Sequence, residues 1–150
     1  ADYRASKAAV RLAATTPGPV YVRLGRFKGP EVYDETFTGD LPYAQVLREG
    51  TDVSLFACGV EVSQALEAAE KLAEKGISAE VVDVFSVSPL DEETLLASAK
   101  KTGRVVTCEE HSIHGGMGSA VAEPCREGPD SHALCGHEVF RHLCTGRRSA

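Results

Sequence analysis

Strand-like and helix-like segments alternate along this chain from about residue 44 to about residue 126, and this alternation constrains the fold more than any other feature. The expected strands are 44–48, 52–58, 77–84 and 105–108, and the expected helices are 61–75 and 90–103. Such an order implies βαβ units and a mainly parallel sheet that helices cover on both faces. We therefore predict an α/β fold with three layers, α/β/α.

The helix over 61–75 has the clearest pattern. Its apolar residues recur at the spacing of one helix face, while Glu67 and Lys71 are spaced to pair on the other face. Gly76 is the expected C-terminal stop. The helix that begins near Asp91 has acidic residues that favour its N-terminal dipole, and Gly103 is expected to end it.

The chain before residue 43 has a different organisation. Residues 2–15 carry the apolar spacing of a helix, and the alternating residues 20–24 predict a strand. Residues 27–42 are rich in glycine, proline and acidic residues without periodicity. We predict that 1–26 is the end of a preceding domain, that 27–42 is a linker, and that 43–128 is the α/β domain.

Composition excludes several classes of function. A formal net charge of −6 argues against a nucleic-acid binder, which normally carries a basic face. No apolar run approaches the ~18 residues of a membrane span, and the first residues do not resemble a signal peptide. These features predict a cytoplasmic protein with small-molecule or protein partners.

The segment Glu109–Ala120 is a candidate site, because it follows a predicted strand and leads into a helix, where α/β folds commonly bind ligands. Its glycines would let backbone N–H groups approach a phosphate, but the dinucleotide spacing is missing. The alternative is a tight turn that packs against a neighbouring subunit, with Glu109, Glu110 and His111 making structural hydrogen bonds.

Cysteine and histidine side chains raise a separate question of metal binding. Cys58 and Cys108 fall in apolar runs and are expected to be core thiols. A second group crowds the C-terminal region and suggests zinc ligands: Cys125, His132, Cys135, His137, His142 and Cys144. These residues contain no Cys-x-x-Cys pair, so we predict no metal site.

Motifs in three separated places resemble the transketolase family. Gly18–Arg26 looks like the last strand of its pyrimidine-binding domain, Leu47–Gly59 looks like the entry to its C-terminal domain, and Glu109–Glu123 is nearly a family signature. With Ser86–Asp91, the similarity covers about residues 10–123 in the correct order. The chain is thus expected to hold the end of the family's second domain and its third domain.

The resemblance implies a role in two-carbon ketol transfer between sugar phosphates. In relatives, thiamine diphosphate and a divalent metal, here magnesium, bind between the first two domains at a dimer interface, so this chain is expected to hold no catalytic residue and to be inactive alone. Arg23 and Arg26 are both placed to grip a phosphate or carboxylate, but the resemblance assigns substrate contact to Arg26 only. The implied partners are an N-terminal transketolase section or the missing domains, in a homo- or hetero-oligomer.

Other functions remain open at this point. Deoxyxylulose-phosphate synthase and the β subunits of 2-oxo acid dehydrogenases share the third domain, although His111-Ser112 and Leu24-Gly25-Arg26 favour the transketolase branch, particularly the kind made as two chains. Two functions from different classes are also open. One is a purely structural oligomerisation domain, and the second is an independent domain that binds a small ligand through Glu109–Ser119.

Residues 129–150 depart from the family pattern. They are rich in His, Cys and Arg, and show no clean period. Codons permitted by Ser131–Ala150 can be read out of frame as PMRFVGTKCFGTSAPAEEA, which matches the expected family ending. We predict a frameshift near Pro129-Asp130, so that unselected sequence replaces the last strand and helix of the domain.

Overall fold

The computed structural model describes residues 2–25, 29–37, 43–112, 114–127 and 141–144, and only the backbone of residues 126–127 and 141–144. Its five-stranded sheet has the order β1-β3-β2-β4-β5. The strands are β1 (Gln45–Arg48), β2 (Val53–Ala57), β3 (Ala79–Asp83), β4 (Val105–Glu109) and β5 (Arg141–Cys144). β1 runs antiparallel to β3 and the other pairs are parallel, so the prediction of a mainly parallel sheet is confirmed.

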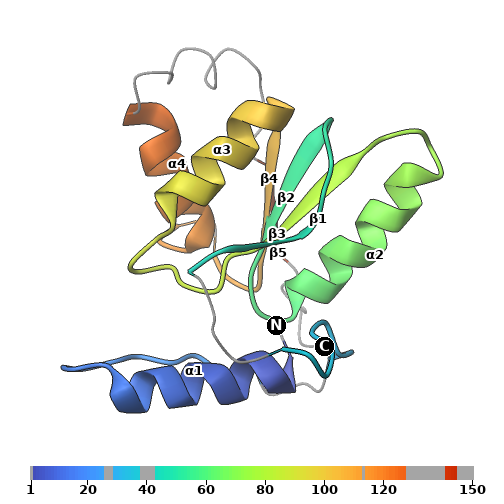
Figure 1. Cartoon of the computed structure of the whole chain (residues 1–150). Coiled ribbons are helices and arrows are strands. Elements are labelled where there is room, and N and C mark those ends of the chain that lie inside the picture. The colour runs from blue at the N-terminus through green and yellow to red at the C-terminus, as the bar shows by residue number, and fades with distance from the viewer. Residues whose placement is uncertain (1, 26–28, 38–42, 113, 128–140, 145–150) are drawn as a thin grey trace, which may run out of the picture.

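Four helices accompany the sheet in the described part of the chain. They are α1 (Tyr3–Thr15), α2 (Glu61–Ala73), α3 (Glu92–Thr102) and α4 (Met117–Glu127). In Figure 1, α2 covers one face of the sheet, and α3 and α4 cover the other. This arrangement confirms the three-layer α/β/α prediction.

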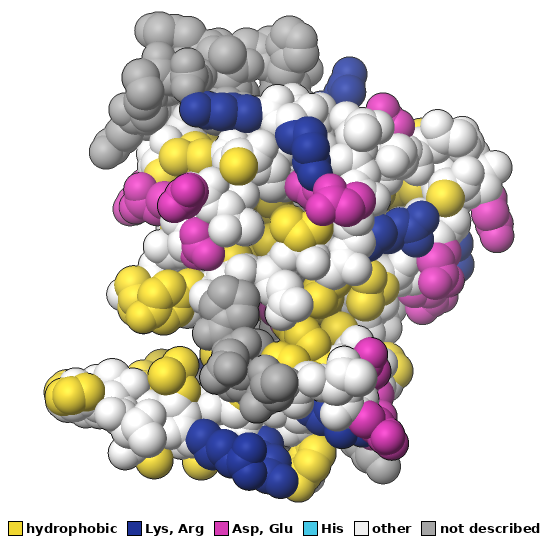
Figure 2. All heavy atoms as spheres, viewed as in Figure 1, with side chains coloured by type: hydrophobic (Ala, Val, Ile, Leu, Met, Phe, Trp, Pro, Cys, Tyr) yellow, Lys and Arg dark blue, Asp and Glu magenta, His cyan; other side chains and the backbone are white. Residues whose placement is uncertain are grey.

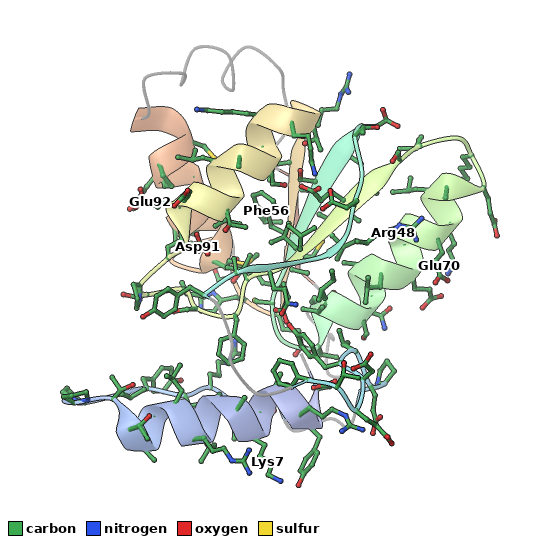
Figure 3. All side chains as sticks on the ribbon, in the orientation of Figure 1. Lys7, Arg48, Phe56, Glu70, Asp91 and Glu92 are labelled. Carbon is green, nitrogen blue, oxygen red and sulfur yellow. The ribbon has the colours of Figure 1, made fainter. Side chains whose placement is uncertain are left out.

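Successive side chains of the central strand enter different halves of the core, because side chains alternate between the two faces of a strand. Phe56 is fully buried with Leu95 and Met117 on the side of α3 and α4, and Figure 3 places it between the sheet and α3. Leu55 and Val62 belong to the second cluster, on the side of α2. A strand buried on both faces is expected to be mainly apolar, which is the pattern that predicted β2, and its polar residue Ser54 is hydrogen-bonded.

The helix ends follow local signals in the sequence. Asp91 accepts a hydrogen bond from the backbone N–H of Thr94 (3.0 Å) and caps α3. Gly103 ends that helix at φ +67°, and Gly76 follows α2 at φ +75°, both in the left-handed region that favours glycine. These two stops were predicted correctly.

The strand predicted over residues 20–24 does not form, and this part of the prediction is wrong. The preceding helix is present as α1, which lies apart from the three layers in Figure 1. A strand is held by hydrogen bonds to a neighbouring strand, and the sheet formed by the described residues has no such neighbour for residues 20–24.

The C-terminal tail contributes one strand to the sheet. β5 pairs in parallel with β4 in the register Val106↔Arg141 to Glu109↔Cys144. A strand thus forms at residues 141–144, within the tail that was predicted to be unselected sequence. The frameshift itself is a statement about the gene and stays a prediction.

Candidate functional site

The last residue of β4 holds the loop that follows this strand. Glu109 is only 3% exposed, and its two carboxylate oxygens accept hydrogen bonds from the backbone N–H groups of Met117 and Gly118, both at 2.8 Å. The carboxylate therefore caps the N-terminus of α4 and lies at the positive end of its dipole. Glu109 makes the structural hydrogen bonds that one of the two interpretations of this segment predicted.

Gly116 is required by the same arrangement. A Cβ atom at this position would lie 2.5 Å from each oxygen of the Glu109 carboxylate. The glycine thus makes room for an internal anion rather than for a phosphate. Because Glu109 already holds the N–H groups that would bind a phosphate, we reject this helix start as a nucleotide site.

Every described helix begins next to a carboxylate. Asp2 caps α1, Asp91 caps α3 and Glu109 caps α4, while Glu61 lies in the first turn of α2. Each acidic group stabilises its helix through the dipole, and each also repels a bound anion. Among the described helices, α1, α3 and α4 therefore have N-termini that internal carboxylates occupy, whereas α2 begins without a side-chain cap.

The carboxyl ends of β2 and β4 form the topological switch point, because the chain leaves β2 toward β3 on one side and later returns to β4 on the other. Here the guanidinium of Arg23 donates hydrogen bonds to the backbone carbonyl of Glu110, at 3.3 and 3.4 Å. The exposed Arg23, which the sequence analysis placed to grip a phosphate or carboxylate, thus contacts the loop after β4 in this structure.

The two cysteines near this edge have little nucleophilic character. Burial, reinforced by the charges of Glu109 and Asp83, raises the pKa of Cys58 to about 12. Burial and the charge of Glu61 raise the pKa of Cys108 to about 11. Both thiols stay protonated at neutral pH, as expected of core thiols, although Cys58 is only partly buried.

A buried polar cluster at the end of β3 is absent from the sequence-based predictions. The hydroxyl of Tyr33 donates a hydrogen bond to Asp83 Oδ2 at 2.8 Å, and both residues are buried. Burial raises the pKa of Asp83, and burial together with the Asp83 charge raises the pKa of Tyr33. An aspartate in the apolar run 77–84 was the available signal, because a buried carboxyl group needs a partner.

A second polar network, which is partly buried, lies at the opposite, amino end of the parallel strands. Lys101 forms ion pairs with Glu49 and with Glu80, whose side chain is fully buried. The hydroxyl of Ser54 lies 2.7 Å from those of Ser98 and Thr102. Internal partners account for these groups except Glu80 Oε1, which has no hydrogen-bond partner among the described residues, and we assign the network a structural role.

The remaining candidates lie partly outside the described residues. Arg26 is one of them, and so are His132, Cys135 and His137, as well as the side chains of His142 and Cys144. Within the described part of the chain, Cys125 is buried and no group of three His, Cys, Asp or Glu side chains is arranged to hold a metal. No helix in that part is long and apolar enough to cross a membrane.

Replacing Glu109 with glutamine tests the internal cap. The amide can accept from only one of the two N–H groups and presents a donor to the other, so we expect the free energy of unfolding to fall by about 1–3 kcal/mol. Urea unfolding followed by circular dichroism measures this change. The adjacent exposed Glu110→Gln is the control and should stay within about 0.5 kcal/mol of wild type; equal effects of the two substitutions would contradict the role of Glu109.

The fold defines an α/β domain that is joined to a further N-terminal segment. Side chains of the chain itself, Glu109 and Arg23, contact the loop at the carboxyl ends of its parallel strands. Residues 42–136 match the family model described as "Transketolase, C-terminal domain". The chain belongs to this family. The match includes the first residues of the atypical tail.

Known relatives place the domain in larger proteins. The chain is 40% identical over 153 residues to an apulose-4-phosphate transketolase subunit of Phocaeicola vulgatus, covering 94% of this chain and 49% of the relative. It is 40% identical over 116 residues to 1-deoxy-D-xylulose-5-phosphate synthase 1 of Geobacter sulfurreducens, covering 76% of this chain and 18% of that protein. The chain thus spans about half or less of the length of these relatives.

A solved structure agrees with the fold. The chain resembles a split-gene transketolase described as an inactive beta4 tetramer, with a TM-score of 0.76 and 43% sequence identity. The similarity covers 96% of this chain and 45% of the solved chain. It therefore includes α1 and the segment after it as well as the α/β domain.

Proposed function

We propose that this chain is the C-terminal section of a thiamine-diphosphate-dependent, transketolase-like transferase that moves a two-carbon ketol unit between sugar phosphates. The observation that carries the proposal is that the chain aligns along 94% of its length with part of a transketolase subunit. Its role is to complete the oligomer and to shape the substrate channel, in the cytoplasm. Within it, Arg26 is the proposed contact to a substrate phosphate.

The starts of α1, α3 and α4 do not fit the diphosphate of the cofactor. All four described helices start beside a carboxylate, and those of α1, α3 and α4 accept the N-terminal N–H bonds that would otherwise bind a diphosphate. We propose that thiamine diphosphate and magnesium are bound by the partner section, and we assign no catalytic residue to this chain.

Exposed apolar side chains support a partner for the N-terminal segment. Tyr3, Val10, Leu12, Val20, Tyr21 and Leu24 are all exposed, and Tyr21 is 87% exposed. Hydrophobic side chains are visible along α1 in Figure 2. Several large apolar side chains exposed in one segment are consistent with an interaction site. We propose that the rest of the preceding domain, supplied by an N-terminal section, covers residues 1–26, and that residues 27–42 link them to the domain over 43–128.

The proposal is tested by mixing two chains. We expect ketol transfer, assayed with thiamine diphosphate and magnesium, only when this chain is combined with a candidate N-terminal section that is itself inactive. Light scattering on the same samples should detect a homo-oligomer of the isolated chain and its conversion to a mixed oligomer. Activity of the isolated chain would overturn the proposal.

The same assay can compare the present C-terminal tail with the proposed natural ending. We propose that the natural ending is PMRFVGTKCFGTSAPAEEA, and sequencing the gene across codons 125–132 tests the frame directly. A variant carrying this ending should be at least as active in the mixture as the present chain. If the present chain and this variant are both inactive with the N-terminal section, the transketolase proposal fails.

The second candidate function is that of a deoxyxylulose-phosphate synthase, and the match to the Geobacter sulfurreducens enzyme favours it. A 2-oxo acid dehydrogenase β subunit and a non-catalytic oligomerisation domain are two further candidates. Formation of deoxyxylulose phosphate by the mixture would favour the synthase, and consumption of a 2-oxo acid would favour the dehydrogenase. Oligomerisation without any of these activities would favour the non-catalytic domain.

A further inference from the structure

The segment before the α/β domain is tied to the sheet by a buried hydrogen bond. Tyr33 belongs to the described stretch 29–37, and its hydroxyl donates to Asp83 Oδ2 (2.8 Å) at the end of β3. Tyr33 is 6% exposed and Asp83 is 1% exposed. The ring of Tyr33 packs on Phe37 with 4.4 Å between ring centroids. An aromatic ring with a buried hydroxyl of this kind holds its backbone in one place.

The backbone of Tyr33 is held in turn by Asp2. One carboxylate oxygen of Asp2 accepts hydrogen bonds from the N–H groups of Val32 and Tyr33, both at 2.8 Å. The other oxygen accepts from the N–H of Ala5 at 2.9 Å and caps α1. A single buried carboxylate therefore joins the start of α1 to the stretch that carries Tyr33.

Polarity explains why these three residues act together. Asp2 and Asp83 are both buried carboxyl groups, and each would be costly without hydrogen bonds. The bonds from Ala5, Tyr33 and Val32 outweigh the effect of burial and lower the pKa of Asp2. The charge of Asp2 also raises the pKa of Asp83, and the charge of Asp83 raises the pKa of Cys58. The Oδ1 atom of Asp83 has no hydrogen-bond partner among the described residues. Tyr33 is thus the donor that lets Asp83 remain at this position.

We infer that Asp2, Tyr33 and Asp83 form a latch that sets the position of α1 and the segment up to residue 25 on the α/β domain. Arg23 makes a further contact from this segment to the Glu110 carbonyl. Because Arg26 follows three residues later, the latch would position the proposed phosphate contact, and this last step rests on the proposed function. The three residues are positioning residues and take no part in the chemistry.

Hydrogen–deuterium exchange on the whole chain tests the latch without any assay of activity. Tyr33→Phe removes only the hydroxyl, so we expect amide exchange in residues 3–15 to become about tenfold faster, while α2 and α3 keep their wild-type rates. Tyr21→Phe, which removes an exposed hydroxyl from the same segment, is the control and should change nothing. Unchanged exchange in α1, or an equal increase in α2 and α3, would overturn the inference.

A second variant alters the contact between Asp2 and the stretch 29–37. Asp2→Asn keeps an oxygen to cap Ala5 but cannot accept from Val32 and Tyr33 with its amide nitrogen. We expect about tenfold faster exchange over residues 29–37, with α2 and α3 unaffected. Wild-type exchange over 29–37 would overturn the role of Asp2.

The link to substrate is tested in the two-chain mixture. For Tyr33→Phe we expect KM to rise about three- to tenfold for a phosphorylated acceptor but not for its unphosphorylated analogue, with kcat nearly unchanged. Equal changes for both acceptors would overturn the positioning role of the latch. If the wild-type mixture has no activity, the proposed function fails, whereas the exchange experiment still decides whether the latch exists.

Discussion

Substituting alanine for Gly50 is expected to lower the free energy of unfolding by about 3 kcal/mol or more, the upper range for an overpacked site. A Cβ atom at this position would lie 2.1 Å from the backbone nitrogen of Glu80 and 2.2 Å from the carbonyl carbon of Ala79. Both neighbours are backbone atoms at the start of β3, so no side-chain rotation relieves the clash. Urea unfolding followed by circular dichroism is the suitable measurement, because the chain has no tryptophan.

The surrounding backbone is also fixed. The N–H groups of Thr51 and Asp52 donate to the Ser78 carbonyl at 3.1 and 2.8 Å, and the N–H of Ser78 donates to Asp52 Oδ2 at 2.7 Å. Moving Gly50 away from β3 would break these bonds. Gly29→Ala is the matched control, since a Cβ there meets nothing within 4 Å. A Gly50 variant as stable as the Gly29 variant would refute this account of the turn.

Substituting alanine for Arg26 is expected to lower kcat/KM for a phosphorylated substrate about 100-fold in the two-chain mixture. Loss of a bidentate, charge-assisted contact to phosphate costs about 2–3 kcal/mol, which corresponds to that factor. Steady-state kinetics with a phosphorylated acceptor and its unphosphorylated analogue measure the effect. The wild-type mixture and the mixture with the Arg26 variant should convert the unphosphorylated analogue at nearly the same rate.

Lys75→Ala provides the control for that experiment. Lys75 is an exposed lysine outside residues 1–26, so its removal takes away the same charge without the proposed contact or the proposed partner surface. Its kinetics should match wild type within about twofold. Equal losses for both acceptors in the Arg26 variant would assign the residue to folding or assembly instead of phosphate binding.

The elements of the α/β domain were predictable because their signals are local. β2 and β3 are short, mainly apolar runs, α2 repeats its apolar residues on one face, and Asp91 and Gly103 mark the ends of α3. Each signal lies within about a dozen residues of the chain, the range over which strand and helix periods operate. The segment after β4 was also predictable from local signals, because it follows a strand and leads into a helix.

The strand expected over 20–24 shows where local pattern fails. Alternation favours an extended chain, but a strand also needs a neighbour to receive its hydrogen bonds, and the described sheet provides none there. Likewise, the acids and glycines after β4 predicted either a ligand loop or a structural turn. Only the 2.8 Å bonds from Met117 and Gly118 to Glu109 decide for the turn.

The sequence by itself determined the layers of the domain, its parallel strands and the ends of α2 and α3, since periodicity and capping act between near neighbours. The tertiary structure alone decided that Tyr33 meets Asp83 across 50 residues and that Arg23 meets Glu110 across 87 residues. No period in the sequence relates such distant positions. Their contact follows from how the folded layers bring the carboxyl ends of the strands to the segment that precedes them.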